Sequence, residues 1–373
     1  MRTRAVTAAI GVLGAAALAC GSASPTLPPP PETSVFDSGR TAYGFFPSPP
    51  KPTFASILET FRSIGEHGDV VLIQPNIPWE EFVESGEGES QAITDIRNQV
   101  ILAGQNGLEA IVVVDPLNGL NRREFFGLPP AWGAANFDTP EVRQAFANFA
   151  LRVLREVRPR YLGLASEINT YADAHPEDFA GFLSLYRDTY AAVKIESPQT
   201  QVFVTFQWED LNNLIPGAAE GRAAYSINWD QIEAFEPELD LWVISSYPFV
   251  VFPSAGEIPD DYYARLLSRT EKPLAVGEGG FPSRPVGPFH GAAEDQVGYL
   301  EALHGQIGER LAFWIYLLLS DFDPDEYAAM MRGDGRSESD IDTLGMFVSV
   351  GLRQANGTPK PALSVWDDYR ENP

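Results

Sequence analysis

Short apolar runs recur along the chain and alternate with segments of helical periodicity. The apolar runs cover 42–46, 70–74, 108–114, 161–166, 201–206, 239–246, 273–277 and 311–316. Most of these runs are continuous rather than alternating, which is typical of strands buried on both faces of a sheet. We therefore predict eight strands that belong to a parallel sheet.

The segments between the apolar runs predict helices. These helices are expected at 54–66, 91–105, 140–157, 177–195, 260–270, 292–307 and 361–370. Thr139 followed by Pro140 predicts the N-cap and the first residue of one helix, because proline suits the first helical position. The stretch 209–238 carries only a weak helical signal and is expected to be a long loop.

Eight strand–helix repeats predict an α/β fold with right-handed crossovers, namely a single (β/α)8 TIM barrel over residues 41–373. A doubly wound sheet shows the same alternation, but its first strand is followed by a Gly-rich GxGxxG turn. In this chain the first strand runs into the segment FFPSPP at 45–50, which has no glycine. The barrel is therefore the preferred fold.

The N-terminus predicts export rather than part of the fold. Residues 1–19 have a basic start and an apolar stretch too short to span a bilayer, so they predict a signal peptide. Cys20 follows directly and resembles the acylated cysteine of a bacterial lipoprotein, although Ala17 stands where such signals more often have Leu. An ordinary signal peptide with a chance cysteine is the alternative. Residues 20–40 would be the lipidated cysteine and a Pro-rich linker, on the periplasmic or cell-surface side of a membrane.

The charge of the 373-residue chain restricts the classes of partner that it can bind. It has 26 basic and 51 acidic residues, a net charge of −25, which excludes a nucleic-acid binder and leaves the lipid anchor as the expected membrane contact. Four His and one Cys are too few for a zinc or iron–sulfur site, so we expect no metal. We also expect no cofactor and a monomer. The acidic run 321–325 is no EF-hand, because Glu326 and Arg332 stand where Gly and Glu are required, although a looser calcium site stays open there.

Two glutamates follow strands that face each other across a predicted barrel. Glu167 comes after the fourth strand, and Glu278 comes after the seventh strand. Catalytic groups of barrels collect at the carboxyl ends of the strands. A pair of carboxyl groups about 5–5.5 Å apart is what a retaining glycosidase needs, one as acid/base and one as nucleophile. The structural alternative is that each Glu caps a helix or pairs with an Arg.

Other polar and aromatic residues cluster at the same predicted strand ends. Aromatic rings stack on the C–H faces of sugars, while amide, carboxyl and hydroxyl groups bind sugar hydroxyls. We therefore predict a carbohydrate substrate, although aromatic rings are also ordinary core residues. The candidate substrate-binding residues are Asn76, Trp79, Asp115, Trp132, Ser166, Asn169, Tyr171, Gln207, Trp208 and Trp314.

Three segments carry a resemblance to a known family. The sequences EIN at 167–169, SSYPF at 245–249 and VGEGGFP at 276–282 resemble glycoside hydrolase family 53, the endo-β-1,4-galactanases of clan A. The resemblance implies that Glu167 is the acid/base, that Glu278 is the nucleophile and that Tyr247 hydrogen-bonds the nucleophile. The clan usually has Asn before the acid/base, where this chain has Ser166, and Asn169 is a candidate to replace that contact in part.

These observations favour a retaining glycoside hydrolase that cleaves β-linked glycans, with a galactan-like substrate favoured by the resemblance. The substitution at Ser166 keeps open a second hypothesis, a non-catalytic carbohydrate-binding lipoprotein with a degenerate barrel. A third hypothesis, a surface scaffold, predicts neither sugar binding nor turnover.

Overall fold

The computed structural model describes residues 34–215 and 221–372. Cys20, the predicted signal peptide 1–19 and the linker up to residue 33 lie outside these described residues. The internal contacts of the described residues define two compact units. One unit comprises 73–105, 110–215 and 221–242, and the other comprises 34–72, 106–109 and 243–372.

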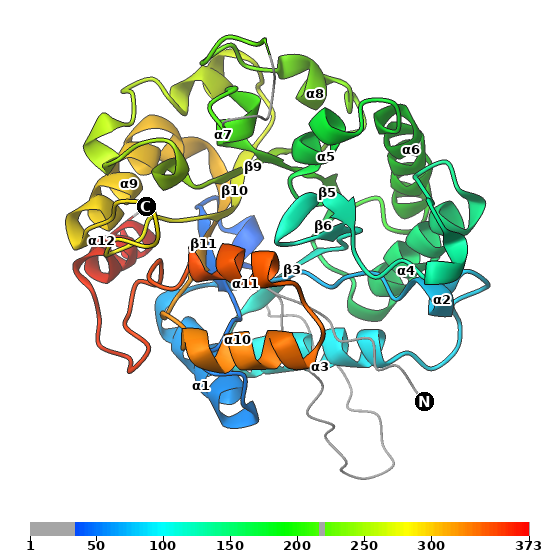
Figure 1. The fold of residues 1–373 in the computed structure, drawn as a ribbon, viewed down its shortest axis with the longest axis horizontal. Coiled ribbons are helices and arrows are strands. Elements are labelled where there is room, and N and C mark those ends of the chain that lie inside the picture. The colour runs from blue at the N-terminus through cyan, green and yellow to red at the C-terminus, as the bar shows by residue number, and fades with distance from the viewer. Residues whose placement is uncertain (1–33, 216–220, 373) are drawn as a thin grey trace. The chain divides into compact units, whose positions relative to one another are not determined.

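Parallel strands connected by helices form the centre of the first unit. Its elements are α2 (Trp79–Phe82), α3 (Gln91–Gln105), β3 (Glu109–Val113), β4 (Leu117–Asn118), β5 (Asn121–Phe125), η2 (Pro130–Trp132), α4 (Pro140–Val157), β6 (Tyr161–Gly163), α5 (Ile168–Ala174), α6 (Phe179–Glu196), β7 (Gln201–Phe203), β8 (Thr205–Gln207), α7 (Trp208–Leu211) and α8 (Trp229–Glu233). The strands β7, β6 and β3 pair in this order, with Leu162 opposite both Val112 and Val202. The helices α4 and α6 supply the two crossovers and lie side by side (Figure 1).

The local sequence explains how these strands and helices form. Helix α4 begins with Pro140 and buries its apolar face, as predicted. Thr139 occupies the N-cap position, but its hydroxyl bonds Asn136 rather than the first turn of the helix, so the expected capping bond is absent. Gly163 in β6 allows close packing, because a Cβ atom there would lie 2.8 Å from a Val113 methyl group.

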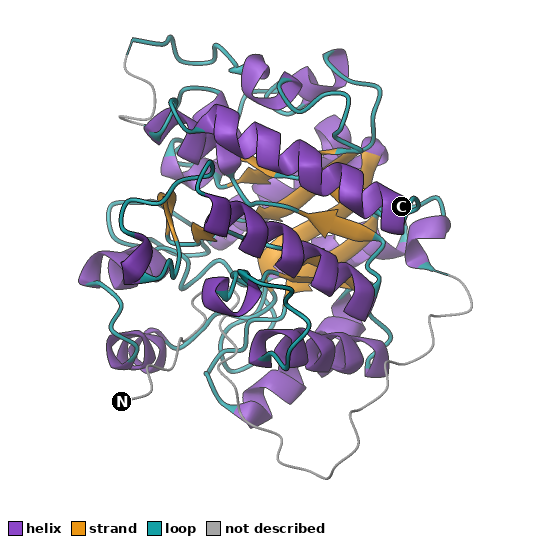
Figure 2. Ribbon diagram, turned by 90° about the vertical axis from the view of Figure 1, so that its right-hand side faces the viewer, coloured by secondary structure: helices purple, strands orange, loops and turns teal. Residues whose placement is uncertain are grey.

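Parallel strands and covering helices also form the second unit. Its elements are η1 (Val35–Asp37), β1 (Ala42–Phe46), α1 (Phe54–His67), β2 (Val70–Ile73), β9 (Trp242–Ser246), η3 (Pro248–Val250), η4 (Ala255–Glu257), η5 (Ala264–Ser268), β10 (Leu274–Gly279), α9 (Ala293–Ile307), η6 (Gly308–Arg310), β11 (Leu311–Leu318), α10 (Pro324–Gly333), α11 (Glu338–Gly345) and α12 (Pro361–Glu371). The strands β2, β1, β11 and β10 pair in this order, and all three pairs are parallel. Figure 2, seen from the side on which Figure 1 labels α4 and α6 of the first unit, shows long helices, in purple, in front of strands, in orange.

An aromatic cluster fastens α12 to the strands of the second unit. The ring of Trp366 lies 5.1 Å from Tyr43, 5.0 Å from Phe45 and 5.4 Å from Trp314, measured between ring centroids. Just before the helix, the buried Lys360 ammonium group donates to Asp321 Oδ1 at 2.7 Å. Helix α12 lies beside α9, which connects β10 to β11 (Figure 1).

Each of the eight predicted strand positions forms β-structure, but one predicted strand and one predicted helix need correction. The run 201–206 is interrupted at Val204 and forms β7 and β8. The segment 260–270 contains the short 3-10 helix η5 rather than an α-helix. Its backbone amides at Tyr263 and Ala264 donate to the Gln306 side chain, which replaces carbonyl partners that a continuous α-helix would use.

Short helices form in the segment 209–238, which was expected to be a loop, and in the segment after β11. α7 and α8 lie within 209–238 or at its edge, and α10 and α11 lie in the loop after β11. The acidic run 321–325 has structural roles, because Asp323 caps α10 and Asp321 pairs with Lys360. Within 34–215 and 221–372, no group of three or more His, Cys, Asp or Glu side chains is arranged to hold a metal ion.

Candidate active site

Glu167 lies at the junction between β6 and helix α5, in the first unit. Its backbone is left-handed, with φ 50° and ψ 43°, a conformation that is uncommon for a residue with a side chain. Its N–H donates to Thr205 Oγ1 at 2.8 Å, so β8 holds the turn in place. The side chain is largely buried, with 8% of the residue exposed. Strained backbone of this kind is often found at functional sites.

A buried arginine contacts the Glu167 carboxylate. Arg122 belongs to β5, which pairs with β4 in a hairpin after β3. Its Nε–H donates to Glu167 Oε2 at 3.1 Å, and its Nη2 donates to Ser166 Oγ at 3.3 Å. Its Nη1 donates to Asp115 Oδ2. One guanidinium group thus joins two predicted substrate-binding residues to the predicted acid/base.

Ser166 and Asp115 are held firmly by other groups as well. The Ser166 hydroxyl lies 3.1 Å from Thr205 Oγ1, and Asp115 accepts from Gln74 Nε2 at 2.8 Å and from the Leu117 N–H at 3.1 Å. Both residues are almost fully buried. The structure therefore places them in a hydrogen-bond network around Glu167, and their predicted contacts with sugar stay predictions.

Two predicted amides support the start of α5 and α7. Asn169 donates through Nδ2 to the Gln207 carbonyl at 3.1 Å and accepts the Gln207 N–H at 2.8 Å. The Gln207 side chain accepts the Asp210 N–H at 2.6 Å and donates to Glu209 at 2.7 Å. Asn76 donates to the backbone carbonyls of Asp115 and Leu117. Sugar binding by any of the three amides would compete with these bonds.

Asp210 is a buried acid beside this network. Burial raises its pKa from 3.8 to about 6, and the Thr170 hydroxyl, which donates to Oδ2 at 2.8 Å, opposes that rise. The negative charges of Asp173 and Glu167 add to it, and Arg123 acts against it. Within the described residues no hydrogen-bond donor reaches Asp210 Oδ1. Folding therefore favours the protonated form of Asp210 more than the unfolded chain does.

We expect Asp210→Asn to stabilise the fold at pH 8 but not at pH 4. The folded pKa lies above the unfolded one, so native Asp210 binds more protons and stability falls as pH rises from about 4 to 6. A rise from 3.8 to about 6 corresponds to about 3 kcal/mol, the upper limit of the gain. Urea unfolding across this pH range measures it, with the exposed Asp188→Asn as control. An Asp210 variant that is no more stable at pH 8 would contradict this account.

The predicted aromatic residues of the first unit pack against other aromatic rings. Trp79 donates from Nε1 to the Phe126 carbonyl at 2.7 Å, and its ring lies 6.4 Å from that of Trp132. The Tyr171 hydroxyl donates to Asp178 at 2.7 Å, and burial together with this carboxylate raises the pKa of Tyr171. Trp208 is fully buried, 6.0 Å from the Trp229 ring. Among these four rings, Trp132 is the one with a partly exposed side chain.

The other predicted catalytic residues lie in the second unit. Glu278 is in β10 and is 3% exposed. Tyr247 follows β9, and its ring packs 5.1 Å from Phe347 and 6.1 Å from Phe249. Trp314 lies within β11 and packs against Trp366, which is a core environment. The roles of Glu278 and Tyr247 stay predictions.

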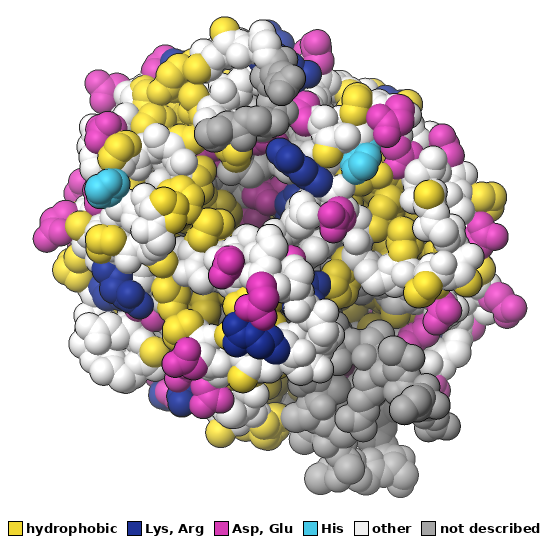
Figure 3. All heavy atoms as spheres, viewed as in Figure 1, with side chains coloured by type: hydrophobic (Ala, Val, Ile, Leu, Met, Phe, Trp, Pro, Cys, Tyr) yellow, Lys and Arg dark blue, Asp and Glu magenta, His cyan; other side chains and the backbone are white. Residues whose placement is uncertain are grey.

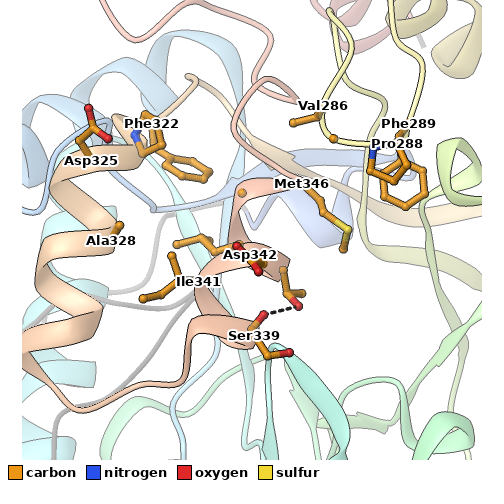
Figure 4. A pocket seen from close by; sticks show the side chains of 15 residues that line it. Val286, Pro288, Phe289, Phe322, Asp325, Ala328, Ser339, Ile341, Asp342 and Met346 are labelled. Atoms are coloured by element: carbon orange, nitrogen blue, oxygen red, sulfur yellow. Dashed lines mark hydrogen bonds between the residues drawn. The ribbon is translucent and has the colours of Figure 1, made fainter.

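An apolar cavity of about 680 Å³ lies in the second unit, between the loop after β10 and the helices after β11 (Figure 4). Phe289, Phe322, Ile341 and Met346 line it, and none of the predicted catalytic or substrate-binding residues is among its lining side chains. The dashed line in Figure 4 is the bond from the Thr343 hydroxyl to the Ser339 carbonyl. Loops at the carboxyl ends of strands carry the binding sites of TIM barrels, so this cavity is on a suitable side for a ligand.

Carboxylate side chains are scattered over the face drawn in Figure 3. This face shows many magenta carboxylates and fewer dark blue cations, in line with the net charge of −25 of the whole chain. Among the residues that the structure describes, no helix is long and apolar enough to cross a membrane.

The fold is similar to that of solved glycosidase structures. A GH5_18 protein from Bifidobacterium longum subsp. infantis matches with a TM-score of 0.61 and 18% identity, over 89% of this chain and 79% of that chain. An exo-β-1,4-mannosidase from Opitutaceae bacterium strain TAV5 matches with a TM-score of 0.62 and 13% identity, over 88% and 58%. The GH53 catalytic domain of Ignisphaera aggregans matches with a TM-score of 0.57 and 14% identity, over 91% and 98%.

These matches show the fold alone, because all three identities are low. The chain has the α/β fold of a (β/α)8 TIM barrel, as its strand–helix pattern predicts. No protein-family model and no curated protein matches the chain. Family 53 is thus one of several glycosidase groups that share this fold with the chain.

Three residues around Glu167 escaped the sequence analysis: Arg122, Thr205 and Asp210. Asp210 lies four residues after the predicted strand 201–206, in the segment at its carboxyl end, and that position is the signal that could have found it. Thr205 lies inside the apolar run 201–206, where a lone hydroxyl is inconspicuous. Arg122 lies in the polar segment NRREF, whose pattern is that of an exposed loop, and no feature of the sequence singles it out.

Proposed function

We propose that the protein is a retaining glycoside hydrolase that cleaves β-linked glycans. The observation that carries the proposal is the buried network that holds Glu167 after β6, within a fold shared with glycosidases. Barrel enzymes place catalytic groups at this position, and an acid/base needs a fixed carboxyl group. The substrate is a β-linked oligosaccharide, with galactans favoured by the three family-53-like segments.

The chemistry takes place in two displacements at the anomeric carbon. Glu167 protonates the glycosidic oxygen as the C1–O bond breaks, and the Glu278 carboxylate forms a bond to C1. Glu167 then removes a proton from water, whose oxygen attacks C1 and releases Glu278. Two inversions leave the product with the β configuration. The mechanism requires both carboxyl groups to reach one anomeric carbon.

The test is hydrolysis with observation of the anomeric product. Purified protein is incubated with β-1,4-galactan, β-mannosides and Manβ1-4GlcNAc, the last because a neighbouring GH5_18 structure is described as a complex with it. A reducing-sugar assay measures turnover, and proton NMR at early times shows the first-formed anomer. A β product from a β substrate supports the proposal, and an α product contradicts retention.

A non-catalytic carbohydrate-binding protein is the second candidate. Ser166 favours it, because a buried short hydroxyl bonded to Thr205 and Arg122 stands where the clan usually has Asn. Isothermal titration on the same samples separates the two candidates. Oligosaccharide binding without any product would favour the binding protein.

Export and anchoring belong to the same proposal. We infer that Cys20 carries the lipid and that the barrel acts outside the cytoplasm as a monomer. The acidic surface and the Pro-rich segment after Cys20 are compatible with a tethered protein that meets soluble glycans.

A further inference from the structure

We propose that Arg122 is a positioning residue, which orients the Glu167 carboxyl group so that Oε1 is the atom that transfers the proton. This inference rests on the proposed glycosidase function. It concerns a residue of the β4–β5 hairpin that does not itself need to touch the substrate.

The guanidinium group of Arg122 contacts one of the two carboxyl oxygens of Glu167. Arg122 is buried, with 7% of its side chain exposed, and its Nε–H lies 3.1 Å from Glu167 Oε2. A guanidinium group donates hydrogen bonds and accepts none. While this bond persists, Oε2 serves as the acceptor, and the transferable proton is favoured on Oε1. Arg122 therefore distinguishes the two oxygens of one carboxyl group.

Arg122 is itself held in place by a carboxylate and by its hairpin. Its Nη1 donates to Asp115, whose carboxylate is fixed by Gln74 and by the Leu117 N–H. The hairpin that carries Arg122 is paired through Leu117 and Phe125. A flexible surface arginine would lose this orientation, but a buried one with fixed partners keeps it.

The backbone of Glu167 is fixed by the same hydrogen-bond network. Thr205 accepts the Glu167 N–H and lies 3.1 Å from Ser166 Oγ, which in turn accepts from Arg122 Nη2. Main chain and side chain of Glu167 are thus held by connected groups. Proton transfer depends steeply on such geometry, because a displaced acid no longer meets the leaving oxygen.

The test measures how kcat/KM depends on the leaving group in Arg122→Gln and Arg122→Lys. The substrates are aryl β-glycosides with phenols of graded acidity, on the sugar that the wild type hydrolyses. Acidic phenols leave without protonation, so we expect nearly wild-type values for them. For weakly acidic phenols we expect a loss of about tenfold or more in Arg122→Gln, on the scale of impaired acid catalysis. Arg122→Lys keeps the positive charge but not the planar guanidinium group. Its kcat/KM for weakly acidic phenols should lie between the values of the wild type and Arg122→Gln.

Arg123→Gln is the matched control, because Arg123 is the exposed neighbour of Arg122 on the same strand. A merely structural defect would lower kcat/KM equally for all phenols. If Arg122→Gln fails to fold, the leaving-group dependence of Arg122→Lys tests the inference instead. Wild-type leaving-group dependence in the folded variants overturns this inference alone, whereas a wild type that hydrolyses no glycoside overturns the proposed function.

Discussion

Glu278→Gln is expected to lower hydrolysis by at least about 10⁴-fold while the protein stays folded, because removal of a covalent nucleophile leaves only binding and acid catalysis. Gln has nearly the shape of Glu, so it fits the same place in β10, where the side chain is buried. The measurement is kcat/KM on the best substrate, with circular dichroism to establish that the variant is folded.

Glu271→Gln is the control for this prediction, because Glu271 is exposed and lies three residues before β10. Glu278→Ala adds a second readout. Azide can enter the space of the lost carboxylate and attack C1 directly, which gives an α-glycosyl azide from a β-glycoside by a single inversion. Full activity of either Glu278 variant would exclude this residue as the nucleophile.

The strands and most helices were predictable because their signals are local. Continuous apolar runs such as 70–74 and 311–316 became β2 and β11, and the helix predicted at 140–157 has the same bounds in the structure. The 3-10 helix η5 was not predictable, because its amide partner is the side chain of Gln306, about forty residues away. The local sequence pattern does not show that a side chain so distant in the chain will accept these backbone N–H groups.

The position of Glu167 after a strand was predictable, whereas the residues that surround it were not. A glutamate after an apolar run is visible in the sequence, but the arginine bonded to it comes from a polar hairpin 45 residues earlier. The aromatic predictions show the same limit. A ring near a strand end packs into the core as readily as it faces a ligand, and Trp314 packs against Trp366. Composition does not distinguish these two environments.

The second large effect is expected for Glu167→Ala, and it depends on the substrate. Without the acid, kcat/KM on a glycan, whose leaving group is a weakly acidic sugar hydroxyl, should fall by about 10²–10⁴-fold. An aryl glycoside with an acidic phenol still forms the glycosyl-enzyme, so a rapid burst of phenol should precede slow turnover. The measurement is stopped-flow absorbance of the released phenol.

Azide separates the role of Glu167 from that of Glu278. In Glu167→Ala the nucleophile is intact, so azide attacks the glycosyl-enzyme in place of water and needs no base. The product is then a β-glycosyl azide, the opposite anomer from the one expected with Glu278→Ala. Glu177→Gln, an exposed carboxylate close behind α5, is the control and should behave as the wild type. An α-glycosyl azide from Glu167→Ala would show that Glu167 is the nucleophile and Glu278 the acid/base. Equal losses of kcat/KM on glycans and on activated aryl glycosides would show that Glu167 takes no part in proton transfer.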